Sequence, residues 1–449
     1  MTSLVIDRVP GQRAARHDHA IGLLQVFAVS LLIFPSDTVV KAIGADGYVA
    51  ALIAYIIFLG YIAVTLFGLH NPLDYRYPIR ITLCLLWLVT LASYALMDRT
   101  MLTAVQQSSA DRWLIQLAGA SGIILIAAEY LHSLEDIHRV LRALVWGGAF
   151  CSIVALLQFL LTLDVTRYLR ILPGFSVDQA AAAATIISRG GFNRVSGTAT
   201  NAIEFGVVAG MLLPLAVYLA MHDTQRARMS RWWPAICIAA ALPTSISRAA
   251  VLAVTLALGM LIICLRSSQR LTAIAAIPLA VTAIYVASPN LIATFGHIIL
   301  AGTSDPSIAH RVGNYPYAAH LIRQNLLIGQ GGGTYVAGPY VNLGLSHILD
   351  DQYLDTTIEL GLTGLAVLIF YMLRPFLAAL TARRHATDPR VRDLCAALGG
   401  SSLAGFACSA TFDSFGFPMF FYVDALVAGL IGAVWLLVHR TSEAASDPG

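Results

Sequence analysis

The sequence predicts an all-α polytopic membrane protein with about twelve transmembrane helices. Hydrophobic residues make up 58% of the 449 residues, whereas charged residues make up only 12%. A soluble globular domain carries about 25% charged residues, so this chain has too few to cover a water-facing surface. Apolar runs of roughly 20 residues, the length of a helix that crosses a bilayer, recur along the chain.

Each apolar run is predicted to form a helix, because backbone polar groups cannot be left unpaired in lipid. Basic residues favour the cytoplasmic side, and the short connections TQRARMSR and ARRHATDPRVR carry dense basic groups. This orientation puts the tails 1–19 and 440–449 in the cytoplasm. The predicted runs are 20–34, 49–68, 80–97, 113–132, 140–163, 202–221, 233–247, 249–266, 271–288, 354–373, 394–411 and 417–438.

Two connections, 164–201 and 289–353, are much longer than the others, and the same orientation places both on the outer face. Long ordered loops are commonly functional. Both contain apolar and aromatic residues, so we expect them to fold and to carry short helices. In the second, Pro306 follows a Ser-Asp pair, as at a helix start, and an interruption near Pro316 is expected.

The remaining features narrow the class of protein. The net charge of +3 is too small to suggest a nucleic-acid partner. The six cysteines lie in apolar runs without a CxxC pair, as small core residues do. Because no internal repeat or low-complexity linker interrupts the chain, residues 1–449 are predicted to form a single membrane domain.

Several outward-facing arginines run against the cytoplasmic bias of basic residues: Arg167, Arg170, Arg189, Arg194, Arg248, Arg311 and Arg323. A planar guanidinium binds phosphate oxygens through two parallel hydrogen bonds. A diphosphate headgroup at the outer membrane surface would need such groups. The alternative is that some of these arginines snorkel or pair with Asp164, Asp178 or Asp305.

Arg248 stands out because it lies in LPTSISRAAVLAV, between two apolar runs with almost no loop. An arginine in such a place normally faces the bundle interior or a wet cavity, and is a candidate for function. Glu204 and Asp424 also lie within apolar runs, and counterions for such arginines are the simplest role for them.

The glycine-rich run GQGGGTYVAGP, residues 329–339, has two interpretations. Glycine backbones can form nests that bind a phosphate. However, the run lacks the GK[ST] of a P-loop and no strand precedes it. The alternative is that the glycines let the chain turn sharply between two helices.

The stretch SHILDDQYLDTTIELGLTG places a histidine and several carboxylates where the second outer connection meets a helix. Asp351, Asp355 and Glu359 are spaced i, i+4, i+8, so they lie along one face of that helix. Carboxylates facing lipid would be very unfavourable, so this face is expected to meet a cavity or basic partners. One of Asp350 and Asp351 could also simply cap the helix.

Four segments, in this order, resemble the O-antigen ligase and polymerase superfamily: RVSGTATN (194–201), TSISR (244–248), RVGNYPYAAHLIRQNLLIGQG (311–331) and DDQYLDTTIELGLTG (350–364). The family's outer loop has an arginine, an aromatic four residues later and an Asn-Pro-Leu-x-Gly-x-Gly turn. Arg311 and Tyr315 match it, with Leu326 in place of the proline. The family's next helix runs from His-Asn-x-Tyr-Leu to Glu-x-Gly-x-x-Gly, which is matched by Tyr353, Leu354, Glu359, Gly361 and Gly364.

Members of this family are integral-membrane glycosyltransferases. They move a glycan from an undecaprenyl-diphosphate carrier to lipid A-core, in ligases, or to another carrier-linked repeat unit, in polymerases. The resemblance implies that no nucleotide sugar, metal or other cofactor is needed. It also implies that Arg194, Arg248 and Arg311 hold the diphosphate. The full set of expected substrate-binding residues is Arg194, Arg248, Arg311, Arg323, Asn201 and Tyr353.

The family's catalytic histidine is absent, because Asp350-Asp351 stands where His-Asn is expected. An acceptor hydroxyl needs a base, and a carboxylate can act as one. The hypothesis is therefore that Asp350 or Asp351 is the base, with His347 as a further candidate. Because the histidine is characteristic of lipid A-core ligases, its absence favours a polymerase.

The predicted function is polymerisation of a surface polysaccharide from an undecaprenyl-diphosphate-linked oligosaccharide, with an O-antigen ligase as the alternative. A transporter or flippase of the same lipid-linked oligosaccharide is a further alternative. The expected location is the bacterial inner membrane, with the active site on the periplasmic face. The expected partners are the carrier-linked glycan, the bilayer, and a chain-length regulator or flippase of the same pathway.

Overall fold

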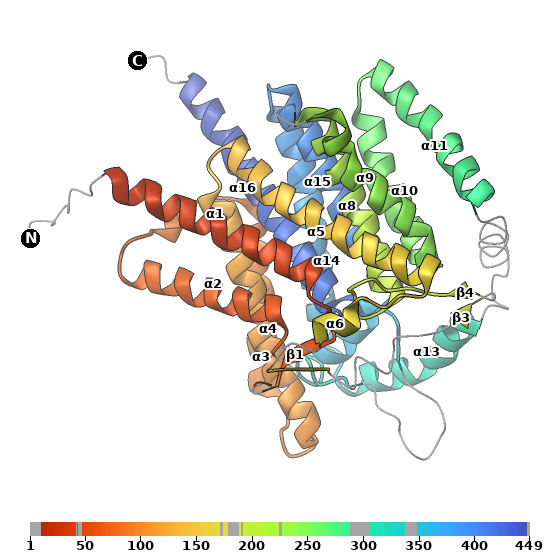
Figure 1. Cartoon of the computed structure of the whole chain (residues 1–449). Coiled ribbons are helices and arrows are strands. Elements are labelled where there is room, and N and C mark those ends of the chain that lie inside the picture. Colours follow the sequence, from red (N-terminus) through yellow and green to blue (C-terminus); the bar gives the residue numbers. More distant parts are fainter. Residues whose placement is uncertain are drawn as a thin grey trace, which may run out of the picture.

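The computed structural model describes residues 10–41, 43, 47–170, 174–177, 188–189, 192–223, 227–287, 306–336 and 348–446. Helices dominate the described part of the chain (Figure 1), as predicted. The long helices are α1 (Pro10–Ile33), α2 (Val49–Leu66), α3 (Pro78–Leu96), α4 (Ala104–Tyr130), α5 (Leu134–Leu161), α8 (Ala202–His222), α9 (Arg228–Ala241), α10 (Arg248–Cys264), α11 (Ser267–Ala287), α13 (Pro306–Gln324), α14 (Gln352–His385), α15 (Pro389–Cys408) and α16 (Pro418–Ser446).

Every predicted apolar run overlaps one of these helices, although the run 233–247 extends past α9 into a 3₁₀ turn; α13 is the only long helix of the described residues outside the runs. Seven helices of the described part are long and apolar enough to cross a membrane: α2, α3, α4, α5, α8, α14 and α16. Shorter apolar helices span Asp18–Ile33 and Arg248–Cys264. The predicted class, an all-α polytopic membrane protein, is confirmed, and the number of twelve spans stays a prediction.

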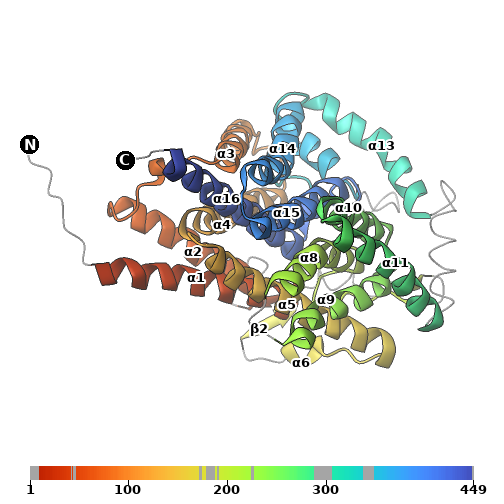
Figure 2. The ribbon, with the colours of Figure 1, turned by 90° about the horizontal axis from the view of Figure 1, so that it is seen from above.

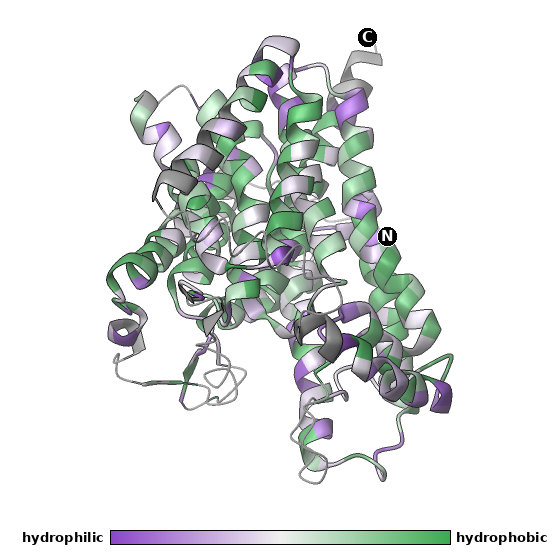
Figure 3. Cartoon of the chain, turned by 90° about the vertical axis from the view of Figure 1, so that its right-hand side faces the viewer, coloured by the Kyte–Doolittle hydropathy of each residue, from purple (hydrophilic) through white to green (hydrophobic). Residues whose placement is uncertain are grey.

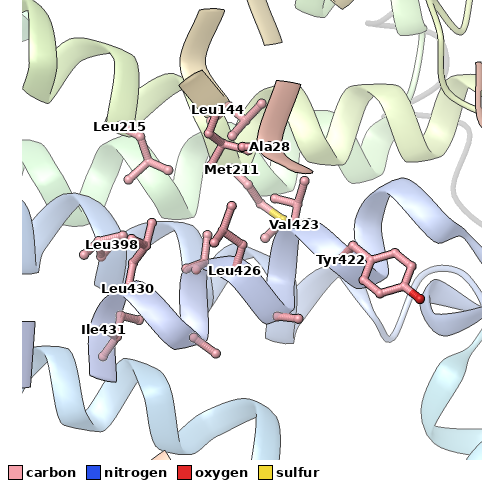
Figure 4. Close-up of a cluster of buried hydrophobic side chains, with 14 of the residues drawn as sticks. Ala28, Leu144, Met211, Leu215, Leu398, Tyr422, Val423, Leu426, Leu430 and Ile431 are labelled. Atoms are coloured by element: carbon pink, nitrogen blue, oxygen red, sulfur yellow. The ribbon is translucent and has the colours of Figure 1, made fainter. Parts of the chain in front are cut away.

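α8 and α16 form the centre of the bundle (Figure 2), since 89% of the membrane-length apolar stretch of each is buried. α16 packs against α4, α14 and α15, and α8 packs against α9, α10 and α15. Figure 4 shows Leu426, Leu430 and Ile431 of α16 within this core. A Cβ on Gly429 would lie 2.7 Å from Cβ of Ala127, so glycine lets α16 approach α4 closely.

Hydrophobic residues run along most of the helices (Figure 3), and many of them are exposed. On α2, the side chains of Ile56, Leu59 and Leu66 are 62%, 64% and 80% exposed. A continuous apolar surface of this kind is unfavourable in water and suits lipid. The outward faces of these helices are therefore the expected lipid-contacting surface.

The connections carry short elements. The first outer connection contains the short helix α6 (Thr166–Arg170) and the strand β2 (Phe175–Val177), which pairs antiparallel with β1 (Thr38–Val40). A second strand pair joins β3 (Ser188–Arg189) and β4 (Phe192–Asn193). The described connections contain the 3₁₀ turns η2 (Pro72–Asp74), η3 (Leu242–Ser245) and η5 (Ser414–Gly416).

The second outer connection contains α13, which begins at Pro306 as predicted. The predicted interruption near Pro316 is wrong, because α13 continues through this proline to Gln324. A proline inside a helix removes one backbone hydrogen bond. The carbonyl that loses its donor belongs to Val312. This residue is 52% exposed, so water can donate a hydrogen bond to the carbonyl.

The two long outer connections share one end of the molecule. Figure 1 shows β1, α6 and α13 together at one end, with the beginning of α14. α1 begins and α16 ends at the opposite end. The fold therefore gathers the segments singled out in the sequence around one end of the bundle.

Candidate functional site

The start of α14 is held by Asp351, which occupies the N-cap position. Its Oδ1 accepts hydrogen bonds from the backbone N–H groups of Tyr353 (2.9 Å) and Leu354 (3.3 Å). The second carboxylate oxygen, Oδ2, has no hydrogen bond to the described residues. Burial raises the pKa of Asp351 above its usual range, and the two backbone hydrogen bonds oppose this shift.

Asp350 instead pairs with an arginine of the second outer connection. Nε of Arg311, on α13, lies 3.6 Å from Oδ2 of Asp350. The same guanidinium donates a hydrogen bond of 2.6 Å to the backbone carbonyl of Thr411. Asp350 has a φ of 51°, an unusual value for a non-glycine residue. The Arg311–Asp350 pair thus joins α13, the start of α14 and the turn after α15.

That turn, residues 409–416, is fixed to α14 by Gln352. The backbone N–H of Gln352 donates to the carbonyls of Ser409 (2.9 Å) and Phe412 (3.2 Å), and its Oε1 accepts from the N–H of Phe415 (2.7 Å). Asp413 lies in the middle of this turn. Burial, together with the nearby charge of Asp350, raises the pKa of Asp413 to about 7.

Next to this turn lies a cavity of about 150 Å³, formed by α4, α14 and the turns that carry Gly333 and Asp413. Its polar lining includes Ser109, Arg112, Trp113, Gln116, Gln352, Asp355, Thr356, Glu359 and Asp413. The carboxylate face predicted for α14 therefore meets a cavity and a basic residue, as its charge requires.

The two inner carboxylates of this face differ in their partners. Oε1 of Glu359 accepts a hydrogen bond of 3.1 Å from the backbone N–H of Tyr335. Oδ1 of Asp355 is buried and has no hydrogen-bond partner in the described residues. Nε1 of Trp113, on the opposite wall, is also buried without an acceptor there. The cavity thus contains an unpaired acceptor and an unpaired donor.

The glycine-rich run packs against a break in α14. Backbone N–H groups of Gln330 and Gly331 donate to the carbonyls of Ile358 (3.0 Å) and Glu359 (2.9 Å). These carbonyls are released because Gly361 has non-helical angles, with φ 68° and ψ −169°. Two amides that a phosphate nest would use are therefore already bonded, which supports the sharp-turn interpretation. Residues 337–339 of the run lie outside the described residues.

Glycine is required at the break for two reasons. A positive φ with this ψ is open almost only to glycine. In addition, a Cβ on Gly361 would lie 2.3 Å from the carbonyl carbon of Leu327, and one on Gly329 would lie 2.2 Å from the carbonyl oxygen of Glu359. The run and α14 are in backbone contact, and this contact forms one edge of the cavity.

We expect Gly361→Ala to destabilise the protein by at least about 3 kcal/mol, because it adds both backbone strain and a steric clash. The measurement is thermal unfolding of purified protein in detergent. The matched control is Gly259→Ala in α10, where no atom lies within 4 Å of the added Cβ. Alanine there should be neutral or slightly stabilising, since it is the better helix former. Equal melting temperatures for the two variants would contradict the prediction.

Arg194 and Arg248 lie together at the turn before α10. Nε of Arg194 donates a hydrogen bond of 3.1 Å to the carbonyl of Ser245, and Arg248 is the first residue of α10. The start of α10 contacts the end of α15, because the Cys408 thiol lies 3.4 Å from the carbonyl of Ala249. Thr411, which binds Arg311, follows shortly after Cys408. Backbone contacts thus bring the segments that carry the three predicted diphosphate-binding arginines to one end of α15.

The other predicted site residues have different positions. Oδ1 of Asn201 accepts from the N–H groups of Ile203 and Glu204, both at 2.8 Å, so Asn201 caps α8. The hydroxyl of Tyr353 donates to the carbonyl of Phe406 at 2.6 Å and ties α14 to α15. Arg323 is exposed in the last turn of α13. His347 lies outside the described residues.

Glu204 binds backbone amides and not an arginine. Its Oε1 accepts from the N–H groups of Met419 (2.8 Å) and Phe420 (3.2 Å), and its Oε2 accepts from the N–H of Thr200 (2.7 Å). These bonds satisfy the first amides of α16, which explains a buried carboxylate at this position. The predicted counterion role is therefore wrong for Glu204.

Sequence reasoning missed Arg112, Trp113 and Gln116 of α4, and Asp413 of the turn. The available signals were weak: Arg112 directly precedes an apolar run, and Asp413 lies in a short TFDSFG connection between two runs. Neither resembles a motif, and their proximity to α14 depends on how distant helices pack. Among the described residues, no three histidine, cysteine or carboxylate side chains form a group that could hold a metal ion.

The buried carboxyl of Asp413 predicts a pH-dependent stability. Its pKa is about 7 in the folded protein and near 3.8 in the unfolded chain, so the folded state binds the proton more tightly. The stabilisation from this proton is complete below pH 4 and is lost as pH rises through 7. Asp413→Asn, which stays neutral, should therefore raise the melting temperature more at pH 8 than at pH 5. The difference between the two pH values corresponds to about 3 kcal/mol, because only the interval from pH 5 to the folded pKa of about 7 contributes.

The control for this measurement is Asp98→Asn, which alters a fully exposed carboxylate bonded only to its own turn. It should change the melting temperature equally at both pH values. An Asp413→Asn effect that is the same at pH 5 and pH 8 would contradict the buried, easily protonated carboxyl.

Comparison with known families gives one match. Residues 233–369 match the family model described as O-antigen ligase. The matched segment contains Arg248, Arg311 and the whole acidic face of α14, whereas α4 and the 409–416 turn lie outside it. No curated protein matches the chain. The resemblance found in the sequence is thereby confirmed for the segment that carries most of the site.

Proposed function

We propose that this chain, a membrane glycosyltransferase of the O-antigen ligase and polymerase superfamily, polymerises surface polysaccharide repeat units carried on undecaprenyl diphosphate. One observation carries the proposal: Arg311 of the outer connection pairs with Asp350 beside Asp351, at the helix start where the family has its catalytic motif. This pairing supports a diphosphate-binding role for Arg311 next to a candidate base.

The diphosphate of the donor requires charge stabilisation more than a proton. Its pKa values are low, so it leaves as an anion and is stabilised by fixed cations. Arg311, Arg194 and Arg248 are proposed to hold it, because contacts bring the segments that carry them to one end of α15. Arginine suits this role because its planar fork binds two oxygens at once. No metal ion is needed in this scheme.

Asp351 is the proposed base. Its capping bonds use Oδ1 and leave Oδ2 without a partner in the described residues, and its raised pKa makes the carboxylate a better proton acceptor. The acceptor hydroxyl attacks the anomeric carbon, its proton passes to Asp351, and the electron pair of the broken bond leaves with the diphosphate. Asp350 is proposed to orient Arg311 through their ion pair.

The alternatives are an O-antigen ligase and a transporter. A ligase differs only in its acceptor, and the Asp-Asp pair in place of His-Asn is the feature that favours a polymerase. A transporter would place its charged groups near the bilayer midplane on broken helices. Here Asp351 caps the start of α14, Asp350 precedes it and Arg248 begins α10, which supports an enzyme.

The proposed setting is the bacterial inner membrane, with both tails in the cytoplasm and the site facing the periplasm. A carrier-linked glycan would then enter from the outer leaflet of the bilayer. A flippase that supplies this substrate and a regulator of chain length are the proposed partners. The basic short connections support this orientation.

The deciding experiment incubates purified protein in lipid nanodiscs with a carrier-linked glycan and no energy source. Longer glycans with release of undecaprenyl diphosphate are the expected result. Transfer only after lipid A-core is added would identify a ligase and overturn the polymerase assignment. Translocation in vesicles without any change in bonding would identify a transporter and overturn both. Surface-glycan profiling of a deletion strain gives an independent check, since a polymerase deletion should lose all long polymer.

A further inference from the structure

We infer that the cavity between α4 and α14 is the acceptor subsite, and that it takes one uncharged pyranose ring of the acceptor glycan. The inference rests on the proposed function and adds the residues that recognise the acceptor. A cavity of about 150 Å³ is large enough for a six-membered ring. It holds a single sugar and not a chain.

The lining chemistry matches hydroxyl groups. Oδ1 of Asp355 is an unpaired buried acceptor and Nε1 of Trp113 is an unpaired buried donor, within the described residues. Unpaired buried polar groups are costly, and most native ones have a partner. A sugar hydroxyl both donates and accepts, so one ring could satisfy the two walls together. Ser109, Gln116 and Thr356 add further polar groups to the same lining.

The charge balance excludes the diphosphate from this cavity. Three carboxylates line it, from Asp355, Glu359 and Asp413, against a single guanidinium, from Arg112. Whether these carboxyl groups are charged or neutral, a single guanidinium among them offers an anion little charge stabilisation. The diphosphate therefore belongs with Arg311, which binds the carbonyl of Thr411, in the turn that carries Asp413. The turn formed by residues 409–416 therefore lies between the proposed donor subsite and the proposed acceptor subsite.

The Trp113 wall of the cavity is closely packed on more than one side. The Trp113 ring stacks on Phe415 with centroids 5.9 Å apart and planes at 20°, and it also contacts Phe421. On another side, a Cβ on Gly333 would lie 2.7 Å from Cβ of Trp113, so the glycine turn packs directly against this residue. A preorganised wall loses little entropy when a ligand binds.

The test uses Trp113→Phe, which keeps an aromatic ring and removes the N–H donor together with part of the ring volume. The acceptor probe is the oligosaccharide released from the carrier by mild acid, which lacks a diphosphate and so cannot serve as donor. Its KM at fixed donor is expected to rise about tenfold, the cost of one lost hydrogen bond of ~1.4 kcal/mol. Inhibition by undecaprenyl diphosphate should stay unchanged. The second variant, Asp355→Asn, should also raise the KM for the oligosaccharide.

The matched controls are Trp87→Phe, whose N–H donates to the Ser121 hydroxyl on α4, outside the cavity, and Asp98→Asn on the surface. Neither should change the KM. An unchanged KM in both cavity variants would overturn the inference, and so would weaker inhibition by undecaprenyl diphosphate. Absence of any transfer by the wild type would instead refute the proposed function. Calorimetric binding of the free oligosaccharide, weakened in Trp113→Phe, would still identify the cavity as a sugar site.

Discussion

Arg311→Ala is expected to lower the rate of glycan transfer by at least about 100-fold, the usual effect of removing a group that stabilises developing charge. Arg311 is the guanidinium that pairs with Asp350 at 3.6 Å and binds the carbonyl of Thr411. Without it the leaving diphosphate loses a cation and Asp350 loses its partner. The measurement is polymer formation from a carrier-linked glycan in nanodiscs.

Two further variants make the Arg311 result specific. Arg311→Lys keeps the charge but not the planar fork, so it should restore only part of the activity. Arg99→Ala is the matched control, because Arg99 is an exposed arginine at the end of α3 that lies over the ring of Tyr94, 5.0 Å from its centroid. It should retain normal transfer. Near-normal activity of Arg311→Ala would refute a role of this arginine in holding the diphosphate.

Asp351→Asn is expected to reduce transfer by about 10²–10⁴-fold, the range for loss of a general base. Asparagine is as good an N-cap as aspartate, so the start of α14 should stay folded. Asp351→Ala removes the cap as well, which should cost a further ~1 kcal/mol of stability. Comparing the two variants separates the role of Asp351 as a base, seen in the transfer rate, from its role as a helix cap, seen in the stability. In the wild type, kcat/KM should fall as pH drops through the raised pKa of Asp351, because only the carboxylate accepts a proton.

Asp350→Asn completes this test. It should weaken the ion pair with Arg311 and raise the donor KM more than it lowers kcat, since Asp350 is proposed to position Arg311. Asp98→Asn again serves as the surface control. Full activity in both Asp350→Asn and Asp351→Asn would exclude the pair from catalysis and leave His347 as the next candidate.

Part of the site followed from the sequence because it depends on local spacing. Asp355 and Glu359 share a helix face by their i, i+4 separation, and the structure finds both lining one cavity. A cap at Asp350 or Asp351 followed from the residue type, and the structure assigns it to Asp351. Asn201 shows the limit of motif reasoning, because a residue within a family motif turned out to cap a helix.

The remaining parts of the site join segments far apart in the chain. The acidic face of α14 meets Trp113 of α4, and the turn with Asp413 is fixed by Gln352. No periodicity links such positions, because their proximity depends on which helices pack together. The glycine run had two interpretations until its amides were found on the carbonyls of Ile358 and Glu359.

The sequence by itself determined the class of fold, the positions of the helices along the chain and the acidic face of α14. Those properties depend on hydropathy and periodicity, which act within one segment. Only the tertiary structure decided that Arg311 pairs with Asp350, that Asp351 caps α14 and that α4 closes the cavity. Such contacts arise because buried polar groups must find partners, and packing selects those partners among distant residues.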